Sequence, residues 1–305
     1  MFDKFAAYLE EKDQSPATVR GYLSDLPIFA LWFEQTTGEQ FSPQVVTPSD
    51  IREFRQYGLL QKKNAGNTVN RRLSALSAYF GFCVEKGALE HNPAQGIRKV
   101  DVPASSPRWL EKKEQYRLSR AIEQDLQLAL TRYPKRWMGR QRDFSILALL
   151  LHTGLRVSEA THLEIADLSI SERKGNLLVR KGKGNKQRTI PLNTDARKAL
   201  KDWLDIRPET PGNDFVFVAL ESDAQGALTS RTVQRSVARY GKKADLPDLT
   251  PHVLRHTFAK NLVDNGVSLE KVAALLGHKS LDTTRIYITP SLRDLEEAVA
   301  MVESE

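Results

Sequence analysis

The chain has 305 residues, of which 40% are hydrophobic and 27% are charged, and its formal net charge is +7 with a pI near 9.4. This composition is typical of an ordinary globular protein, and the length is sufficient for two domains. No apolar run reaches transmembrane length, and the amino terminus lacks the apolar core of a signal peptide. The single cysteine, Cys83, excludes an intramolecular disulfide. We therefore expect a soluble cytoplasmic protein with no membrane partner.

The positive charge is concentrated in one part of the sequence. Residues 1–107 contain 12 basic and 12 acidic residues, so the remainder carries the whole net charge. The last fifteen residues hold one arginine and five acids, which leaves +11 on residues 108–290. A basic region of this kind is compatible with a polyanionic partner such as nucleic acid.

Helical periodicity dominates the first hundred residues. One apolar face is entered through Ser15 and Pro16, the expected Ncap and N1 residues, and it continues through Val19, Leu23, Leu26, Ala30 and Phe33. Pro27 lies inside this run and should kink or divide the helix. Thr47-Pro48-Ser49-Asp50 opens a shorter helix, and a second long face runs through Val69, Leu73, Leu76, Phe80 and Cys83.

A linker should follow this helical bundle. Asn92-Pro93 ends the bundle, and residues 98–108, with prolines at 103 and 107, are typical of a linker. We place the domain boundary near residue 105, between a domain of residues 1–105 and one of residues 106–305. Several polar side chains at or near helix starts could contact DNA phosphates or could equally form a solvated face: Thr18, Arg20, Thr68, Asn70, Arg71 and Arg72.

The second domain should be mainly α with a small antiparallel sheet. We expect a helix from Glu111 to about Thr131, a basic loop over residues 132–142, and a buried helix over residues 144–152. The segments 177–180 and 188–192 flank Gly182-Lys183-Gly184-Asn185 and predict a β-hairpin. Helices should resume at Asp195, with a short extended segment over residues 215–218.

The hairpin is strongly basic. Residues 173–188 contain seven Lys and Arg residues and no acid, and Lys181, Lys183, Lys186 and Arg188 are candidate DNA contacts. Taken alone, a solvated basic turn is the more common explanation. A phosphate-binding loop is excluded, because Lys183 is not followed by Ser or Thr and no helix starts there.

Three short motifs carry arginine, histidine and tyrosine. Arg156 follows a glycine, and Glu159 three residues later could hold its guanidinium if a helix restarts there. His252, Arg255 and His256 share one helix face, and the sequence supplies no thiolate or carboxylate nearby to complete a metal site. A glycine ends the helix Leu269–Leu276, which leaves His278 at the helix exit. Asp282 should cap a short helix that carries Tyr287, and both His278 and Tyr287 are candidate site residues.

In this order the motifs resemble those of the tyrosine recombinase, or phage integrase, family, and of its Xer-like and mobile-element branches in particular. The matching segments are Thr153–Glu159, Gly182–Lys186, His252–His256, Leu275–His278 and Thr283–Tyr287. The resemblance implies a two-domain, C-shaped clamp with a helical, SAM-like core-binding domain and a catalytic domain. It implies a site-specific DNA recombinase that forms a 3′-phosphotyrosine and a Holliday junction and needs neither a metal, nor ATP, nor a cofactor.

The resemblance also implies a role for each matching residue. Tyr287 would be the nucleophile and Lys183 the general acid for the leaving 5′ oxygen. Arg156 and Arg255 would hold the nonbridging phosphate oxygens, while Glu159 orients the arginine side. His278 would donate a hydrogen bond to the phosphate, and His252 would assist proton handling at the nucleophile.

The expected partners are double-stranded DNA, three further copies of the chain in a tetramer on two sites, and an accessory protein or second recombinase. The tail after Tyr287 predicts an amphipathic helix through Leu292, Leu295, Val299 and Val302. Such a helix could fold back on its own chain, whereas the resemblance implies that it docks on a neighbouring protomer. The preferred biological role is integration, excision or cointegrate resolution of a mobile element, and Xer-type chromosome dimer resolution is the alternative. A type IB topoisomerase, an inactive DNA-binding protein and a metal-dependent nuclease fit less well.

Overall fold

Tertiary contacts divide the chain into two compact units, residues 1–105 and residues 106–305. The computed structural model describes residues 2–103, 107–180, 187–209, 211–220, 228–278, 280–288 and 299. Lys181, Lys183 and Lys186 therefore lie outside the described residues, and so does the tail after Ile288 apart from Val299. No helix in the described part of the chain is long and apolar enough to cross a membrane.

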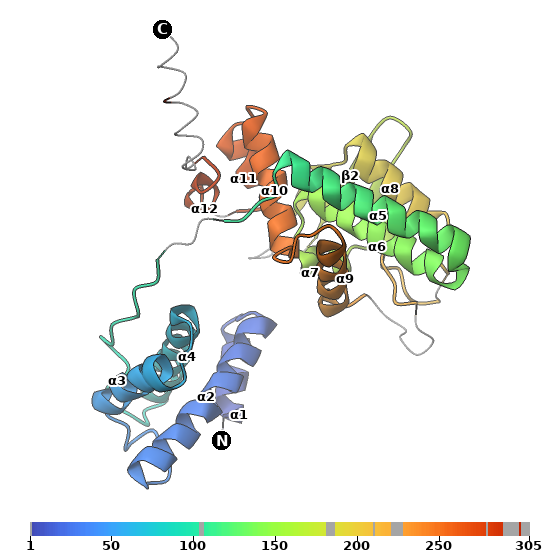
Figure 1. The fold of residues 1–305 in the computed structure, drawn as a ribbon. Helices are drawn as coiled ribbons and strands as arrows, with labels where there is room; N and C mark the ends of the chain where they lie inside the picture. Colours follow the sequence, from blue (N-terminus) through green and yellow to red (C-terminus); the bar gives the residue numbers. More distant parts are fainter. Residues whose placement is uncertain are drawn as a thin grey trace. The chain divides into compact units, whose positions relative to one another are not determined.

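The first unit is a helical bundle (Figure 1). It contains α1 (Asp3–Glu11), α2 (Pro16–Thr37), α3 (Pro48–Gln56), the π-helical turn η1 (Tyr57–Gln61) and α4 (Gly66–Glu85). The Ser15 hydroxyl accepts the Thr18 backbone N–H, and Thr47 and Asp50 form a complete capping box, so both predicted helix starts are confirmed. Aromatic side chains fill the core between α2, α3 and α4: Phe29, Trp32, Phe33, Phe54, Tyr79 and Phe80.

Pro27 does not divide α2, which was one of the two effects that the sequence predicted for it. The helix is assigned without interruption from Pro16 to Thr37. Leu26, just before the proline, and Phe29, two residues after it, are 1% and 0% exposed. Burial of these large side chains is worth roughly 1.5–3 kcal/mol each, enough to offset the loss of one backbone hydrogen bond.

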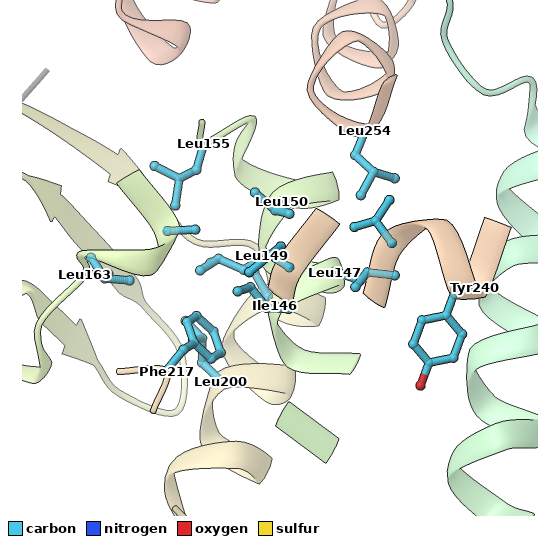
Figure 2. Close-up of a cluster of buried hydrophobic side chains, with 14 of the residues drawn as sticks. Ile146, Leu147, Leu149, Leu150, Leu155, Leu163, Leu200, Phe217, Tyr240 and Leu254 are labelled. Atoms are coloured by element: carbon cyan, nitrogen blue, oxygen red, sulfur yellow. The ribbon is translucent and has the colours of Figure 1, made fainter. Parts of the chain in front are cut away.

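The second unit surrounds the long helix α6 (Pro134–Thr153). The helices α5 (Lys112–Arg132), α8 (Thr194–Leu204), α9 (Ser230–Lys243) and α10 (Pro251–Asp264) all pack against it. Figure 2 shows Ile146, Leu147, Leu149 and Leu150 of α6 at the centre of a buried cluster that Leu200, Phe217 and Leu254 complete. The apolar segment 144–152 is thus a buried helix, as predicted.

The basic stretch 132–142 is helical except at Tyr133, which separates α5 from α6, so the prediction of a loop is wrong. Pro134 occupies the first turn of α6, where its missing N–H costs nothing. Arg140 forms an ion pair of 3.0 Å with the buried Asp125 of α5, and Arg142 donates to the Val218 carbonyl. The fold itself provides partners for these two arginines, so a basic run can form the first turns of α6.

A three-stranded antiparallel sheet contributes Leu177, Val179 and Ile190 to the same buried cluster. It consists of β1 (Leu168–Ile170), β2 (Gly175–Val179) and β3 (Arg188–Pro191), in the order β1-β2-β3, with Val179 opposite Arg188. The pairing confirms the predicted hairpin. The short helices α7 (Val157–Thr161) and η2 (Ile165–Asp167) precede the sheet, and α11 (Leu269–Leu276) and α12 (Asp282–Arg285) follow α10.

Candidate active site

Arg156 lies at the junction between α6 and α7. Gly154 ends α6 in the left-handed conformation, with φ of +63°, and Arg156 is the extended Ncap residue of α7. The Glu159 carboxylate accepts the Arg156 backbone N–H at 2.8 Å and its guanidinium at 2.9 Å. The Arg156 side chain remains 30% exposed, whereas that of Glu159 is 5% exposed. Glu159 therefore holds an arginine whose outer face is open to a ligand.

Arg255 is a second arginine, buried beneath the same junction. Its guanidinium donates to the carbonyls of Gly154 and, at 2.7 Å, of Leu276. Burial and the nearby Arg156 charge lower the pKa of Arg255 to about 10. The side chain still carries its charge at neutral pH, and a cation held in such a setting is stabilised by an anionic partner.

The prediction of Arg188 as a DNA contact requires a correction, because its guanidinium is paired with groups inside the protein. Its guanidinium makes two hydrogen bonds to the Glu159 carboxylate, at 2.9 and 2.8 Å, and a third to the Leu275 carbonyl at 2.9 Å. Only 11% of the side chain is exposed. Each of its three nitrogens donates to a partner inside the protein, so the fork is committed to Glu159.

His278 leaves α11 after Gly277, as the sequence predicted. Gly277 is in the left-handed conformation at the C-cap, and His278 Nδ1 is 2.9 Å from the Thr284 hydroxyl of α12. Burial and the charges of Arg255 and Arg156 lower the pKa of His278 to about 4. The imidazole is thus neutral at physiological pH and stands next to two arginines.

Tyr287 follows α12 rather than lying on it, because the helix ends at Arg285. The side chain is 2% exposed and packs against Ala259, Val272 and Leu276. Burial raises the pKa of the phenol, although the Arg255 charge acts in the opposite direction. A phenol of this kind is neutral and needs a proton acceptor before it can attack an electrophile.

The hydroxyl of Tyr287 is 2.7 Å from Nδ1 of His256, a residue that we did not include among the expected site residues. Burial, with the charges of His252 and Arg255, lowers the pKa of His256 to about 4. His252 itself is exposed at the start of α10. The signal was present in the sequence, because His256 shares the helix face of His252 and Arg255, but spacing alone does not show which histidine reaches the phenol.

The candidate residues of the first unit divide into two groups. Asn70 is committed to the fold, since its amide donates to the Val100 carbonyl and accepts the Val100 N–H at 2.7 Å. Its assignment as a DNA contact is therefore corrected. Arg71 and Arg72 both pair with the buried carboxylate of Asp25, yet Arg71 stays 47% exposed while Arg72 is 15% exposed.

The remaining candidates of this unit lie at helix starts. Arg20 is exposed and Thr18 and Thr68 are partly buried near the first turns of α2 and α4. Within the described ranges, no group of three or more His, Cys, Asp and Glu side chains is arranged to hold a metal ion.

The two-unit fold, together with the cluster formed by Arg156, Glu159, Arg255, His278 and Tyr287, defines a class of protein. Residues 109–292 match the model of the phage integrase family, and residues 2–87 match the N-terminal SAM-like domain of phage integrases. The chain belongs to this family, the tyrosine recombinases, and is a site-specific DNA recombinase.

Two curated relatives cover nearly the whole chain. The tyrosine recombinase XerA of Pyrococcus furiosus is 34% identical over 98% of this chain and 92% of its own length. The tyrosine recombinase XerC of Thermodesulfovibrio yellowstonii is 32% identical over 94% of this chain and 90% of its own length.

Solved structures support the same fold. A XerH site-specific recombinase bound to palindromic difH DNA superimposes with a TM-score of 0.75 at 24% identity, over 98% of this chain and 85% of that one. The integrase of the transposon Tn1549, in complex with transposon right-end DNA, gives a TM-score of 0.70 at 18% identity and covers 98% of both chains.

Proposed function

We propose that this recombinase cuts and rejoins double-stranded DNA through a 3′-phosphotyrosine on Tyr287. The observation that carries the proposal is the concentration of charge around one carboxylate. Three guanidiniums, those of Arg156, Arg188 and Arg255, are close enough to interact electrostatically, and Glu159 is the acid among them. A phosphodiester would supply the missing negative charge.

In the cleavage step, the Tyr287 oxygen forms a bond to phosphorus and the bond to the 5′ oxygen breaks. Arg156 and Arg255 hold the nonbridging oxygens and stabilise the charge of the transition state, and His278 adds a hydrogen bond. The phosphate stays esterified throughout, so religation consumes no ATP and needs no metal. Because Tyr287 is 2% exposed, attack also requires a displacement of the segment that carries it.

Two protons must move during cleavage. The phenol proton passes to His256, the histidine within hydrogen-bond distance, while the exposed His252 assists from the same helix face. Lys183 protonates the leaving 5′ oxygen, which would otherwise depart as a high-pKa alkoxide. This role for Lys183 rests on the family motif in residues 182–186.

The partner is double-stranded DNA carrying a specific site, and the active assembly is a tetramer on two such sites that exchanges strands through a Holliday junction. Residues 1–105 and 106–305 act as the core-binding and catalytic domains. In the first unit Thr18, Arg20, Thr68 and Arg71 are the best-placed phosphate contacts, and Lys181 and Lys186 serve in the second. The XerH, Tn1549 and lambda integrase structures, all bound to DNA, support this partner. An accessory protein or a second recombinase could complete the assembly.

A mobile element is the biological context that we propose, with integration, excision or cointegrate resolution as the reaction. Chromosome dimer resolution is the second candidate, because the curated relatives at 34% and 32% identity are Xer recombinases. The DNA beside the coding sequence separates the two contexts. Inverted repeats and a transposase gene would support the first, and a chromosomal palindrome bound by the protein would support the second.

The nucleophile can be tested directly. Duplexes selected from a random library for binding to the protein would be rebuilt with a nick near the scissile position, so that the cleaved fragment diffuses away and the adduct accumulates. We expect wild-type protein to form a covalent adduct, and Tyr287→Phe to bind the same DNA with equal affinity yet form none, because only a hydroxyl is lost.

Peptide mapping of the adduct identifies the residue that carries DNA. Tyr240 is the internal control, since its hydroxyl is buried and donates to Asp125 at 3.1 Å. Adduct formation by Tyr287→Phe, or an adduct mapped to another tyrosine, would refute the assignment.

A further inference from the structure

Arg188 joins three elements that carry site residues. It stands at the first position of β3, contacts Glu159 of α7 through two nitrogens, and contacts the Leu275 carbonyl of α11 through Nε. Each of these hydrogen bonds is 2.8–2.9 Å long. A planar fork with a third donor at Nε is a geometry that arginine alone among the side chains provides.

In this arrangement each carboxylate oxygen of Glu159 accepts two hydrogen bonds. Oε1 accepts from the guanidiniums of Arg156 and Arg188, and Oε2 accepts from the Arg156 backbone N–H and from Arg188. Burial alone would raise the pKa of Glu159, but the hydrogen bonds and charges of the two arginines outweigh it and hold that pKa below its usual range. The carboxylate is therefore ionised and needs a full counter-charge.

The end of α11 is shaped around the same guanidinium. A Cβ at Gly277 would lie 2.9 Å from Nη1 and 3.1 Å from Cζ of Arg188, and φ of Gly277 is +67°. A glycine is thus required here by the backbone and by the close approach of the arginine. The next residue is His278, so the contact also sets where that imidazole leaves the helix.

We propose that Arg188 is a positioning residue for DNA cleavage, one that neutralises Glu159 so that Arg156 remains available to the scissile phosphate. Without Arg188, the Glu159 carboxylate has Arg156 as its remaining guanidinium partner and competes with the phosphate for it. The inference rests on the proposed function, because it assumes that Arg156 binds the phosphate. It assigns Arg188 no contact with DNA.

The test compares Arg188→Met and Arg188→Lys with wild-type protein on the nicked duplex described above. At saturating protein we expect the single-turnover rate of adduct formation to fall roughly 100-fold in Arg188→Met, the usual cost of misplacing a catalytic group by about 1 Å. Affinity for an intact single site should stay within about twofold, because Arg188 does not contact DNA. Arg188→Lys restores the charge but not the fork, and should recover part of the rate.

Two further measurements show through which residue the loss of Arg188 slows cleavage. The double variant Glu159→Gln/Arg188→Met should cleave no more slowly than the slower single variant, since both changes act on one interaction. A substrate with sulfur at the 5′ bridging position, which leaves without protonation, should not restore Arg188→Met. Restoration would mean that the residue acts through the general acid Lys183 and would overturn the proposal.

Arg180→Met is the matched control. Arg180 follows β2, and its guanidinium pairs with the buried carboxylate of Asp167 and, at 3.8 Å, with that of Glu164, rather than with Glu159. We expect this variant to cleave at the wild-type rate. A wild-type rate in folded Arg188→Met or Arg188→Lys would overturn the proposal. Loss of folding in both variants would also overturn it, because the role of Arg188 would then be to stabilise the fold. Absence of any adduct with wild-type protein would instead contradict the proposed function.

Discussion

His256 and His278 hold neutral imidazoles among positive charges. Each has a pKa lowered to about 4, mainly by burial and then by neighbouring cations, Arg255 in both cases. A histidine that stays neutral at physiological pH can accept the proton of a phenol, as His256 is placed to do for Tyr287. Burial and the local charges therefore keep both imidazoles neutral, and a neutral His256 has a free position for the proton of the phenol.

This arrangement predicts how stability depends on pH. Between the ordinary histidine pKa near 6.5 and the folded value of about 4, the unfolded chain binds protons that the folded chain does not. The free energy of unfolding should therefore decrease as the pH falls through this window. Near pH 5, His256→Gln and His278→Gln should each reduce the slope by about 1.4 kcal/mol per pH unit, the value for one proton.

Urea unfolding at several pH values from 7 to 4.5 measures that slope. His91→Gln is the control, because His91 is exposed in the first unit. An unchanged slope in both active-site variants would show that neither histidine is held neutral by the fold.

At the scale of elements, the site depends on a close junction between α6, α10 and α11. Gly154 turns the chain at the end of α6 and offers its carbonyl to Arg255 of α10. A Cβ on Gly154 would lie 2.4 Å from Cδ1 of Phe258 and 2.8 Å from Cδ2 of Leu276. The glycine thus lets three helices approach closely enough to bring Arg156 and Arg255 near each other.

We predict that Gly154→Ala destabilises the protein by about 2–5 kcal/mol. Roughly 1–2 kcal/mol comes from the left-handed backbone and 1–3 kcal/mol from overpacking. Gly212→Ala is the matched control, because Gly212 has φ of +74° but nothing within 4 Å of the added Cβ. Chemical denaturation compares the two variants, and an equal loss of stability in both would exclude the packing term.

At the scale of the whole molecule, the positive charge is concentrated in the second unit. Residues 108–290 carry the positive charge, and the tail that follows is acidic. We predict that truncation after Pro290 leaves binding to one DNA site nearly unchanged but weakens cooperative binding and abolishes recombination between two sites. The aliphatic face of the tail helix would supply roughly 1.5–3 kcal/mol per buried side chain to the contact between protomers.

Gel-shift titration on one-site and two-site duplexes, followed by a recombination assay, separates these effects. A variant that keeps the tail but replaces Leu292 and Leu295 with serine controls for loss of the acidic charge. Normal recombination by the truncated protein would refute the docking role of the tail.

Local features of the fold were predictable from the sequence because they depend on neighbouring residues. The caps at Ser15 and Thr47 and the glycine that ends α11 satisfy backbone groups within one helical turn. Amphipathic periodicity likewise identified the long helices. The motifs around Arg156, Arg255 and Tyr287 pointed to the family, and the comparisons confirm it.

Pairing between distant residues was decided by the tertiary structure alone. Arg188 is 29 residues from Glu159, and His256 is 31 residues from Tyr287. A basic strand residue and a histidine on a helix face look the same in sequence whether they meet solvent, DNA or a buried partner. Burial distinguishes these cases, because desolvating a charge or a polar group is tolerated only where a partner compensates for it.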